Sequence, residues 1–130
     1  MTFQITSAYA AVLGLLAIFL SFQVIRMRAK TKVSLLDGDN MALKECIRRH
    51  GNFIEYVPLT LILMGFAEAG GASSNWLHAI GGILLISRFI HPFGIKHDNG
   101  SAPARVIGAA GTQIAMLLAI GLIGWQHWGQ

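Results

Sequence analysis

The chain has 130 residues, of which 54% are apolar and only 12% charged. This length predicts one domain, residues 1–130, and the composition excludes an ordinary water-soluble domain in favour of a membrane protein. The formal net charge of +4 would suit a nucleic-acid partner. However, many of the basic residues lie in loops beside apolar segments, so we expect no nucleic-acid partner.

Residues 4–25 form the first predicted membrane span. Met1 to Ile25 contain no charged residue, and about 20 apolar residues suffice to cross the hydrocarbon region. The competing interpretation is a cleavable signal peptide, which needs a basic stretch before its apolar core. Here the basic residues follow that core, so we expect a retained helix.

The second predicted span, residues 46–67, contains the most informative motif of the chain, RRHGNFIEY. Its Arg48, Asn52 and Glu55 are spaced i, i+4, i+7, so on a helix they share one face. Ionisable side chains at membrane depth cost about 2.5–3.5 kcal/mol each and usually face a bundle interior or a polar cavity. The motif therefore predicts a polar site inside a membrane protein.

Two other residues of the second span have more than one interpretation. Pro58 predicts a kink, which either opens the helix beside the polar site or is simply a tolerated membrane proline. Cys46 is the single cysteine of the chain, which excludes an internal disulfide. We expect it to be a packed side chain rather than a nucleophile.

The third and fourth predicted spans cover residues 76–95 and 105–126. Arg88 and His91 lie at the end of the third span, and Arg105 opens the fourth. The second and fourth spans start at the membrane face where the third ends. These residues and the polar face of the second span therefore lie in the same half of the membrane and can share a pocket. Small residues at i, i+4 spacing, Ala104, Gly108 and Thr112, predict close packing of another helix on the fourth span.

The loops indicate how the four-helix bundle lies in the membrane. The basic residues between the first two spans and between the last two are Arg26, Arg28, Lys30, Lys32, Lys44, Lys96 and Arg105, whereas the opposite side has none. Basic loops stay cytoplasmic, so both termini are predicted on the non-cytoplasmic side. The predicted fold is an all-α, multi-pass integral membrane four-helix bundle.

The predicted pocket has a definite chemistry. Its arginines offer guanidinium groups to carboxylates, Asn52 offers an amide, and Glu55 can accept from an amino group or a neighbouring arginine. This set suits a zwitterionic ligand with several carboxylates, and an opening toward lipid would admit an apolar second substrate. The alternative is that Glu55 and Arg48 or Arg88 form only an ion pair that fixes the register of the helices.

Other polar residues have less specific interpretations. Arg49, Lys44, Lys30 and Lys32 are expected to contact solvent or lipid phosphates. His91 is either a ligand contact or proton shuttle, or a solvated loop residue. His97 has no visible helical partner. The histidines and carboxylates lack a metal-ligand spacing, so we predict no metal.

The motif residues Arg48, Asn52, Glu55, Tyr56 and Pro58 resemble the second-helix pattern of the MAPEG family, the membrane-associated proteins of eicosanoid and glutathione metabolism. The wording GNFIEYVPL looks like the bacterial branch. QVIRMR resembles the basic end of the family's first helix and RFIH an Arg-x-x-His pattern of its third. Through these matches the resemblance implies glutathione-binding roles for Arg28, Arg48, Asn52, Glu55, Tyr56, Arg88 and His91.

The resemblance also implies an assembly and a reaction. It implies a homotrimer in the bacterial inner membrane with glutathione, the cosubstrate, between neighbouring subunits, and a transferase or peroxidase reaction on a lipophilic small molecule or lipid. Arg105 matches the arginine that stabilises the glutathione thiolate and is the predicted catalytic residue. Lowering a thiol pKa by two units needs about 2.7 kcal/mol of selective anion stabilisation, which a desolvated arginine can supply.

Two other function classes remain open. A non-catalytic lipid-binding or scaffold protein of the same fold would keep Asn52 and Glu55 and need no thiolate stabiliser. A small multidrug exporter shares the length and the four spans, but it should carry a buried carboxylate in its first span, and residues 1–25 contain none.

Overall fold

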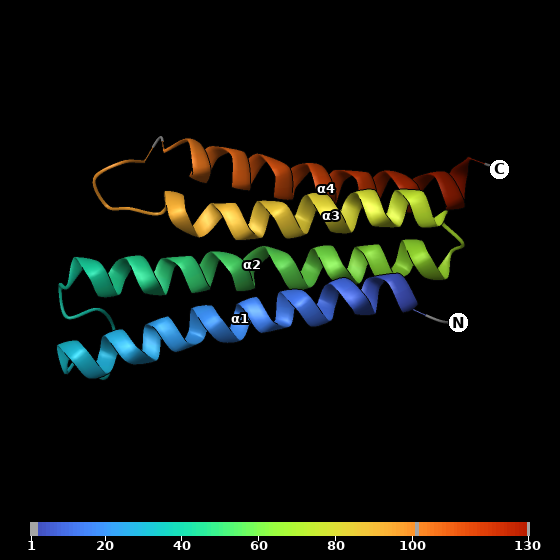
Figure 1. The fold of residues 1–130 in the computed structure, drawn as a ribbon. Helices are drawn as coiled ribbons and strands as arrows, with labels where there is room; N and C mark the ends of the chain where they lie inside the picture. The colour runs from blue at the N-terminus through green and yellow to red at the C-terminus, as the bar shows by residue number, and fades with distance from the viewer. Residues whose placement is uncertain (1–2, 101, 130) are drawn as a thin grey trace.

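The computed structural model describes residues 3–100 and 102–129, and the rest of the predicted 1–130 domain lies outside the described residues. Four long helices run side by side (Figure 1). A short 3-10 helix, η1, follows the third, and β-structure in the described residues is limited to one bridge between Lys96 and Asn99. The predicted all-α four-helix fold is confirmed. The long helices are α1 (Gln4–Thr31), α2 (Met41–Ala69), α3 (Ser74–Ile90) and α4 (Pro103–Trp128), and η1 spans His91–Gly94.

Three of the described helical segments are long and apolar enough to cross a membrane: α1, α3 together with η1, and α4. Helix α2 falls short of this criterion because its first half carries the charged motif. Its 29 residues nevertheless give a length of about 43 Å at 1.5 Å per residue, which exceeds the hydrocarbon thickness of about 30 Å. Helix α2 continues through Pro58 as one helix and packs against its three neighbours.

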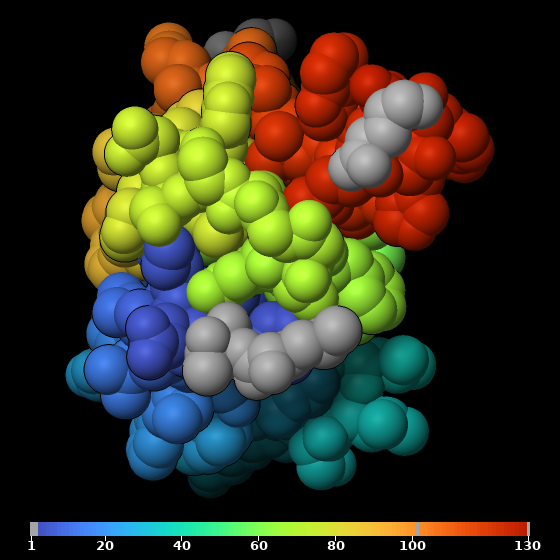
Figure 2. Space-filling view, turned by 90° about the vertical axis from the view of Figure 1, so that its right-hand side faces the viewer, coloured from blue at the N-terminus to red at the C-terminus, as the bar shows by residue number. Residues whose placement is uncertain are grey.

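The apolar core runs along the bundle axis and contains residues from all four helices. Leu13, Phe53, Ile80 and Ala119 are representative, each at most 4% exposed. Seen from the end that carries both termini, α1 and α4 occupy opposite corners (Figure 2). The loops after α1 and α3 lie together at the other end of the bundle (Figure 1). The start of α2, the end of α3 and the start of α4 therefore share one level, as the sequence predicted.

Helix α4 crosses α3 and η1 at very short range. A Cβ atom added to Gly108 would lie 2.6 Å from the Cβ of His91, and one added to Gly111 would collide with the hydroxyl of Ser87. Thr112, one turn beyond Gly108, is 1% exposed. The close packing predicted from the small residues of this helix is confirmed, and α3 with η1 is its partner.

The first turn of α1 is capped from a distant part of the chain. Glu68, near the end of α2, accepts hydrogen bonds from the backbone amides of Ile5 and Thr6 at 2.9 and 2.8 Å. Those amides have no partner within their own helix, and a carboxylate there also complements the helix dipole. Sequence reasoning gave Glu68 no role, because its partners lie more than 60 residues away.

Candidate functional site

Arg88 is the centre of the polar site and joins three helices. Its side chain is only 2% exposed. One terminal nitrogen donates to the Oδ1 of Asn52 on α2 and the other to the carbonyl of Gly108 on α4, both at 2.9 Å. A buried guanidinium is costly unless such acceptors surround it. Arg88 is therefore a cross-link of α2, α3 and α4 at the level of the predicted pocket.

The Arg48–Glu55 pair lies on the same face of α2 as Asn52 but in a different environment. Nη1 of Arg48 is 2.8 Å from Oε1 of Glu55, and the two side chains are 55% and 49% exposed. The helix face predicted from the i, i+4, i+7 spacing thus exists. Its outer part is accessible, and Glu55 pairs with Arg48 rather than with Arg88.

His91 and Arg105 complete this corner of the bundle. His91 is 5% exposed and lies within electrostatic range of Arg88, Arg105 and Arg48. Arg105 is exposed in the first turn of α4. Its backbone lies so close to Gly94 that a Cβ atom added to Gly94 would collide with it. Tyr56 is half-buried and within electrostatic range of Arg88. We call Arg48, Asn52, Glu55, Arg88, His91 and Arg105 the arginine cluster.

Arg28 is bonded elsewhere. Its Nη1 donates to the carbonyls of Val33 and Leu36, at 3.3 and 2.9 Å, and so closes the loop between α1 and α2. One chain by itself therefore engages Arg28 with its own loop. The glutathione contact of Arg28 stays a prediction, as do those of the other predicted site residues.

A second polar group ties the start of α2 to the loop after η1. Arg49 donates to Glu45 Oε2 at 3.1 Å and to the carbonyl of Ile95 at 2.9 Å, so it has partners within the chain, while its expected contact with solvent or lipid phosphates stays a prediction. His97 donates its backbone N–H to Glu45 Oε1 at 2.9 Å, and its Nδ1 lies 2.8 Å from the same oxygen. Sequence reasoning missed this group, although the i, i+4 spacing of Glu45 and Arg49 was a usable signal.

The same contacts set the acidity of Glu45, which precedes the predicted span of α2. The hydrogen bond from the His97 side chain lowers the pKa of Glu45 most, and the backbone N–H of His97 lowers it further. Partial burial acts in the opposite direction and is outweighed. Among the residues that the structure describes, no three His, Cys, Asp or Glu side chains are grouped as metal ligands would be.

A comparison with known families shows to which family this fold belongs. Residues 6–125 match the model of the MAPEG family. The chain belongs to the MAPEG family. Inner membrane protein YecN of Escherichia coli K12 is 38% identical over 94 residues, which cover 72% of each chain. The YecN protein of Escherichia coli O6:H1 strain CFT073 matches equally well.

Family membership confirms what the second-helix pattern indicated. The chain is a MAPEG membrane protein of the bacterial type, with the motif residues on one face of α2. The functional role of the arginine cluster stays a prediction.

Proposed function

We propose that this MAPEG protein is a glutathione-dependent transferase or peroxidase that acts on lipophilic electrophiles in the membrane. The observation that supports this most is that the polar residues of α2 lie in two different environments. Asn52 is fixed by the buried Arg88, while the Arg48–Glu55 pair beside it is about half exposed. A rigid amide next to an accessible guanidinium and carboxylate is what a zwitterionic peptide requires.

The ligand's charged groups exchange partners with the exposed pair. Where water from the cytoplasm reaches this pair, the ion pair is worth only about 0–1 kcal/mol, so opening it costs little. Arg48 then binds a glutathione carboxylate, Glu55 accepts from the amino group, and Asn52 hydrogen-bonds a peptide unit. Arg88 fixes the position of Asn52, and Tyr56 and His91 line the inner wall of this site.

Arg105 stabilises the reactive sulfur in this proposal. A thiol with a pKa of about 8.5 is only slightly ionised at neutral pH, so an adjacent guanidinium increases the thiolate population. Arg105 is exposed in the single chain, and the electrostatic effect grows when water is excluded. A homotrimer supplies that cover, with the neighbouring subunit contributing Arg28 to the same ligand.

The proposed orientation follows from the loops. The basic loops at one end of the bundle (Figure 1) lie in the cytoplasm, and both termini lie on the other side of a bacterial inner membrane. Glutathione enters from the cytoplasm, and the lipophilic substrate arrives from the surrounding lipid. The lipid-facing side chains of α1 and α4, such as Leu15 and Leu117, are largely exposed.

The binding step is tested by calorimetric titration of the detergent-solubilised protein with glutathione. Wild type should release heat of binding, and Arg48→Ala should weaken the affinity at least about tenfold, since hydrogen bonds to charged groups contribute about 1.5–3 kcal/mol. Arg26→Ala is the matched control, because Arg26 is exposed on α1 outside the arginine cluster. An absence of binding by wild type would refute the ligand assignment.

The chemical step is tested by conjugation of glutathione to a model electrophile in membranes. Arg105→Ala should lower the rate about 10²-fold or more, as removal of a single anion-stabilising donor does in other enzymes. A lipid-binding or scaffold protein is the second candidate, and the bonds of Arg88 to α2 and α4 favour it, because such a cross-link stabilises the bundle without any ligand. Wild-type membranes without any conjugating or peroxidase activity would support this second candidate.

A further inference from the structure

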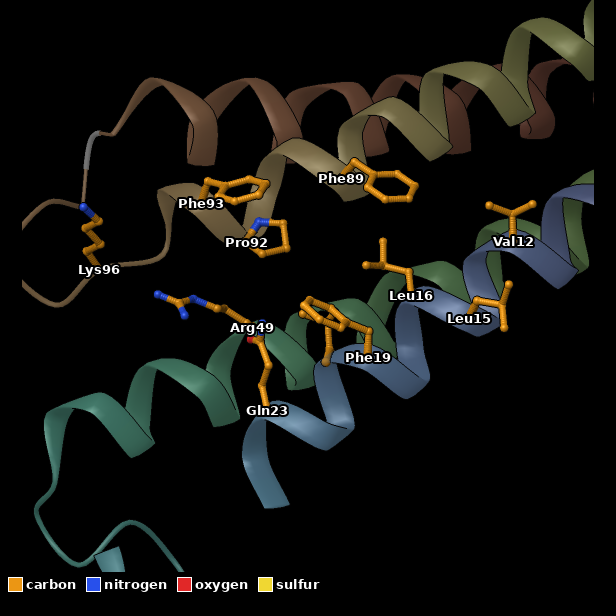
Figure 3. A pocket seen from close by; sticks show the side chains of 11 residues that line it. Val12, Leu15, Leu16, Phe19, Gln23, Arg49, Phe89, Pro92, Phe93 and Lys96 are labelled. Carbon is orange, nitrogen blue, oxygen red and sulfur yellow. The ribbon is translucent and has the colours of Figure 1, made fainter. Parts of the chain in front are cut away.

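A concave site lies apart from the arginine cluster. It is a groove of about 630 Å³ between α1 on one side and the end of α3 with η1 on the other. Figure 3 shows the side chains of α1 on one side of the gap and those of α3 and η1 on the other. We call it the α1–α3 groove, and it is lined by Val12, Leu15, Leu16, Phe19, Leu20, Gln23, Arg49, Phe89, Pro92, Phe93 and Lys96.

The α1–α3 groove is separate from the arginine cluster. The two share no residue. Arg48 and Arg49 are neighbours in sequence, but successive residues of an α-helix are about 100° apart around its axis. Arg48 accordingly reaches Glu55, whereas Arg49 reaches Glu45 and the carbonyl of Ile95. Arg88 and Phe89 are also successive residues of a helix, so Arg88 lies in the cluster and Phe89 in the groove. A ligand in the groove is therefore not the ligand of the cluster.

The walls of the groove are apolar and lie at membrane depth. Leu15 and Phe19 of α1 are 69% and 57% exposed, and Phe89 and Phe93 face them from the other side (Figure 3). Exposed apolar side chains are ordinary on a membrane helix, because they contact lipid tails. A hollow of this size is different, since its volume is within the range of about 300–1,000 Å³ that holds one ligand.

The polar groups gather at one end of the groove. Gln23, Arg49 and Lys96 all lie toward the end nearest the basic loops and are spread between α1 and the loop after η1 (Figure 3). The Nε of Arg49 is buried and has no hydrogen-bond partner among the described residues. Arg49 forms an ion pair with Glu45, which partly neutralises its charge. Lys96 is exposed and adds a second positive charge. An apolar groove that ends in cationic donors complements an acyl chain that ends in an anion.

We propose that the α1–α3 groove is a binding site for an anionic phospholipid of the leaflet on the side of the two loops. One acyl chain lies along Leu15, Phe19 and Phe89, and the phosphate is held by Lys96, Arg49 and Gln23. Basic pockets between membrane helices on the cytoplasmic side select anionic headgroups in this way. The site is independent of the proposed glutathione chemistry and contributes instead to packing α1 against α3.

The experiment is native mass spectrometry of the detergent-solubilised protein incubated with equal amounts of dioleoyl phosphatidylglycerol and dioleoyl phosphatidylcholine. Wild type should retain phosphatidylglycerol preferentially. Lys96→Gln should reduce that retention about fivefold, the effect of one lysine at a membrane surface. Lys30→Gln is the matched control, because Lys30 is exposed on the same side and outside the groove.

A second pair of variants tests the apolar part of the site. Leu15→Trp fills the groove from an exposed position and should abolish retention of phosphatidylglycerol. Leu117→Trp, at a site on α4 that is 65% exposed, should leave it unchanged. Equal retention of the two lipids by wild type, or equal effects of the two lysine variants, would overturn the proposal. So would binding of oleate in place of phosphatidylglycerol, or a change in subunit number in Leu15→Trp without loss of lipid, which would assign the groove to a second copy.

Discussion

Two arginines at nearly the same depth of this bundle, Arg88 and Arg48, have opposite environments. Arg88 is 2% exposed and bonded to α2 and α4, whereas the side chain of Arg48 is 55% exposed and bonded to Glu55 on its own helix. The first joins helices, and the second is available to a ligand. The difference teaches that a charged residue at membrane depth can either stabilise the fold or be accessible to a ligand. Its hydrogen-bond partners distinguish these two roles.

The largest expected effect is on the arginine that joins the helices. Arg88→Met should lower the free energy of unfolding by about 2–4 kcal/mol, because the oxygen of Asn52 loses its buried donor and a tightly packed side chain is removed. Titration with a denaturing detergent, followed by circular dichroism, measures this. If Arg88→Met lowered the free energy of unfolding no more than Arg48→Ala does, the proposed distinction between the two arginines would be refuted.

The helix contact behind Arg88 should be nearly as sensitive. Gly108→Ala places a Cβ atom 2.6 Å from that of His91, and overpacking of this kind costs about 1–3 kcal/mol. Gly121→Ala is the matched control on α4, since a Cβ there meets nothing within 4 Å. The same unfolding titration compares them, and equal stability of the two variants would contradict the close crossing.

The exposed pair should behave in the reverse way. Arg48→Ala should change the free energy of unfolding by about 0–1 kcal/mol, even though it weakens glutathione binding in the proposed function. Unfolding titration and calorimetry on the same preparation measure the two effects. A strongly destabilised Arg48→Ala protein would favour the alternative in which the pair only fixes helix register.

The smallest expected effect concerns the Glu45–His97 contact and is a pH dependence. The pKa of Glu45 is lowered in the folded protein from its ordinary value of 4.5. Its contribution to stability is therefore present above that value and is lost as pH falls through the folded-state pKa. The protection of the amides of residues 95–100 against hydrogen exchange, measured relative to an unstructured peptide at the same pH, should decrease in that acidic range in wild type and should be low at all pH values in Glu45→Gln.

Much of this arrangement was predictable from periodicity and hydropathy. The apolar stretches predict the helices, and the spacing of Arg48, Asn52 and Glu55 predicts their common face. Alternation of the chain across the bilayer brings Arg88 and Arg105 to the same level. These inferences need only helix geometry and the thickness of a membrane.

The partners of individual side chains were not predictable. Sequence alone allowed Glu55 to pair with either Arg48 or Arg88, and side-chain reach and burial decide for Arg48. The bond from Arg49 to the carbonyl of Ile95 was also not expected, and it forms because the loop after η1 folds back over α2. Such contacts depend on the path of a loop, which has no periodic signal.

The carboxylate of Glu68 has a consequence for biosynthesis. It supplies the acceptors for the amides of Ile5 and Thr6, so the amino-terminal end of the first helix stays unfinished until the ribosome has translated past residue 68. The first two helices therefore complete their folding together as a helical hairpin, and the hydrogen bonds to Glu68 form last. A truncated nascent chain that ends before this acid should leave its opening turn frayed.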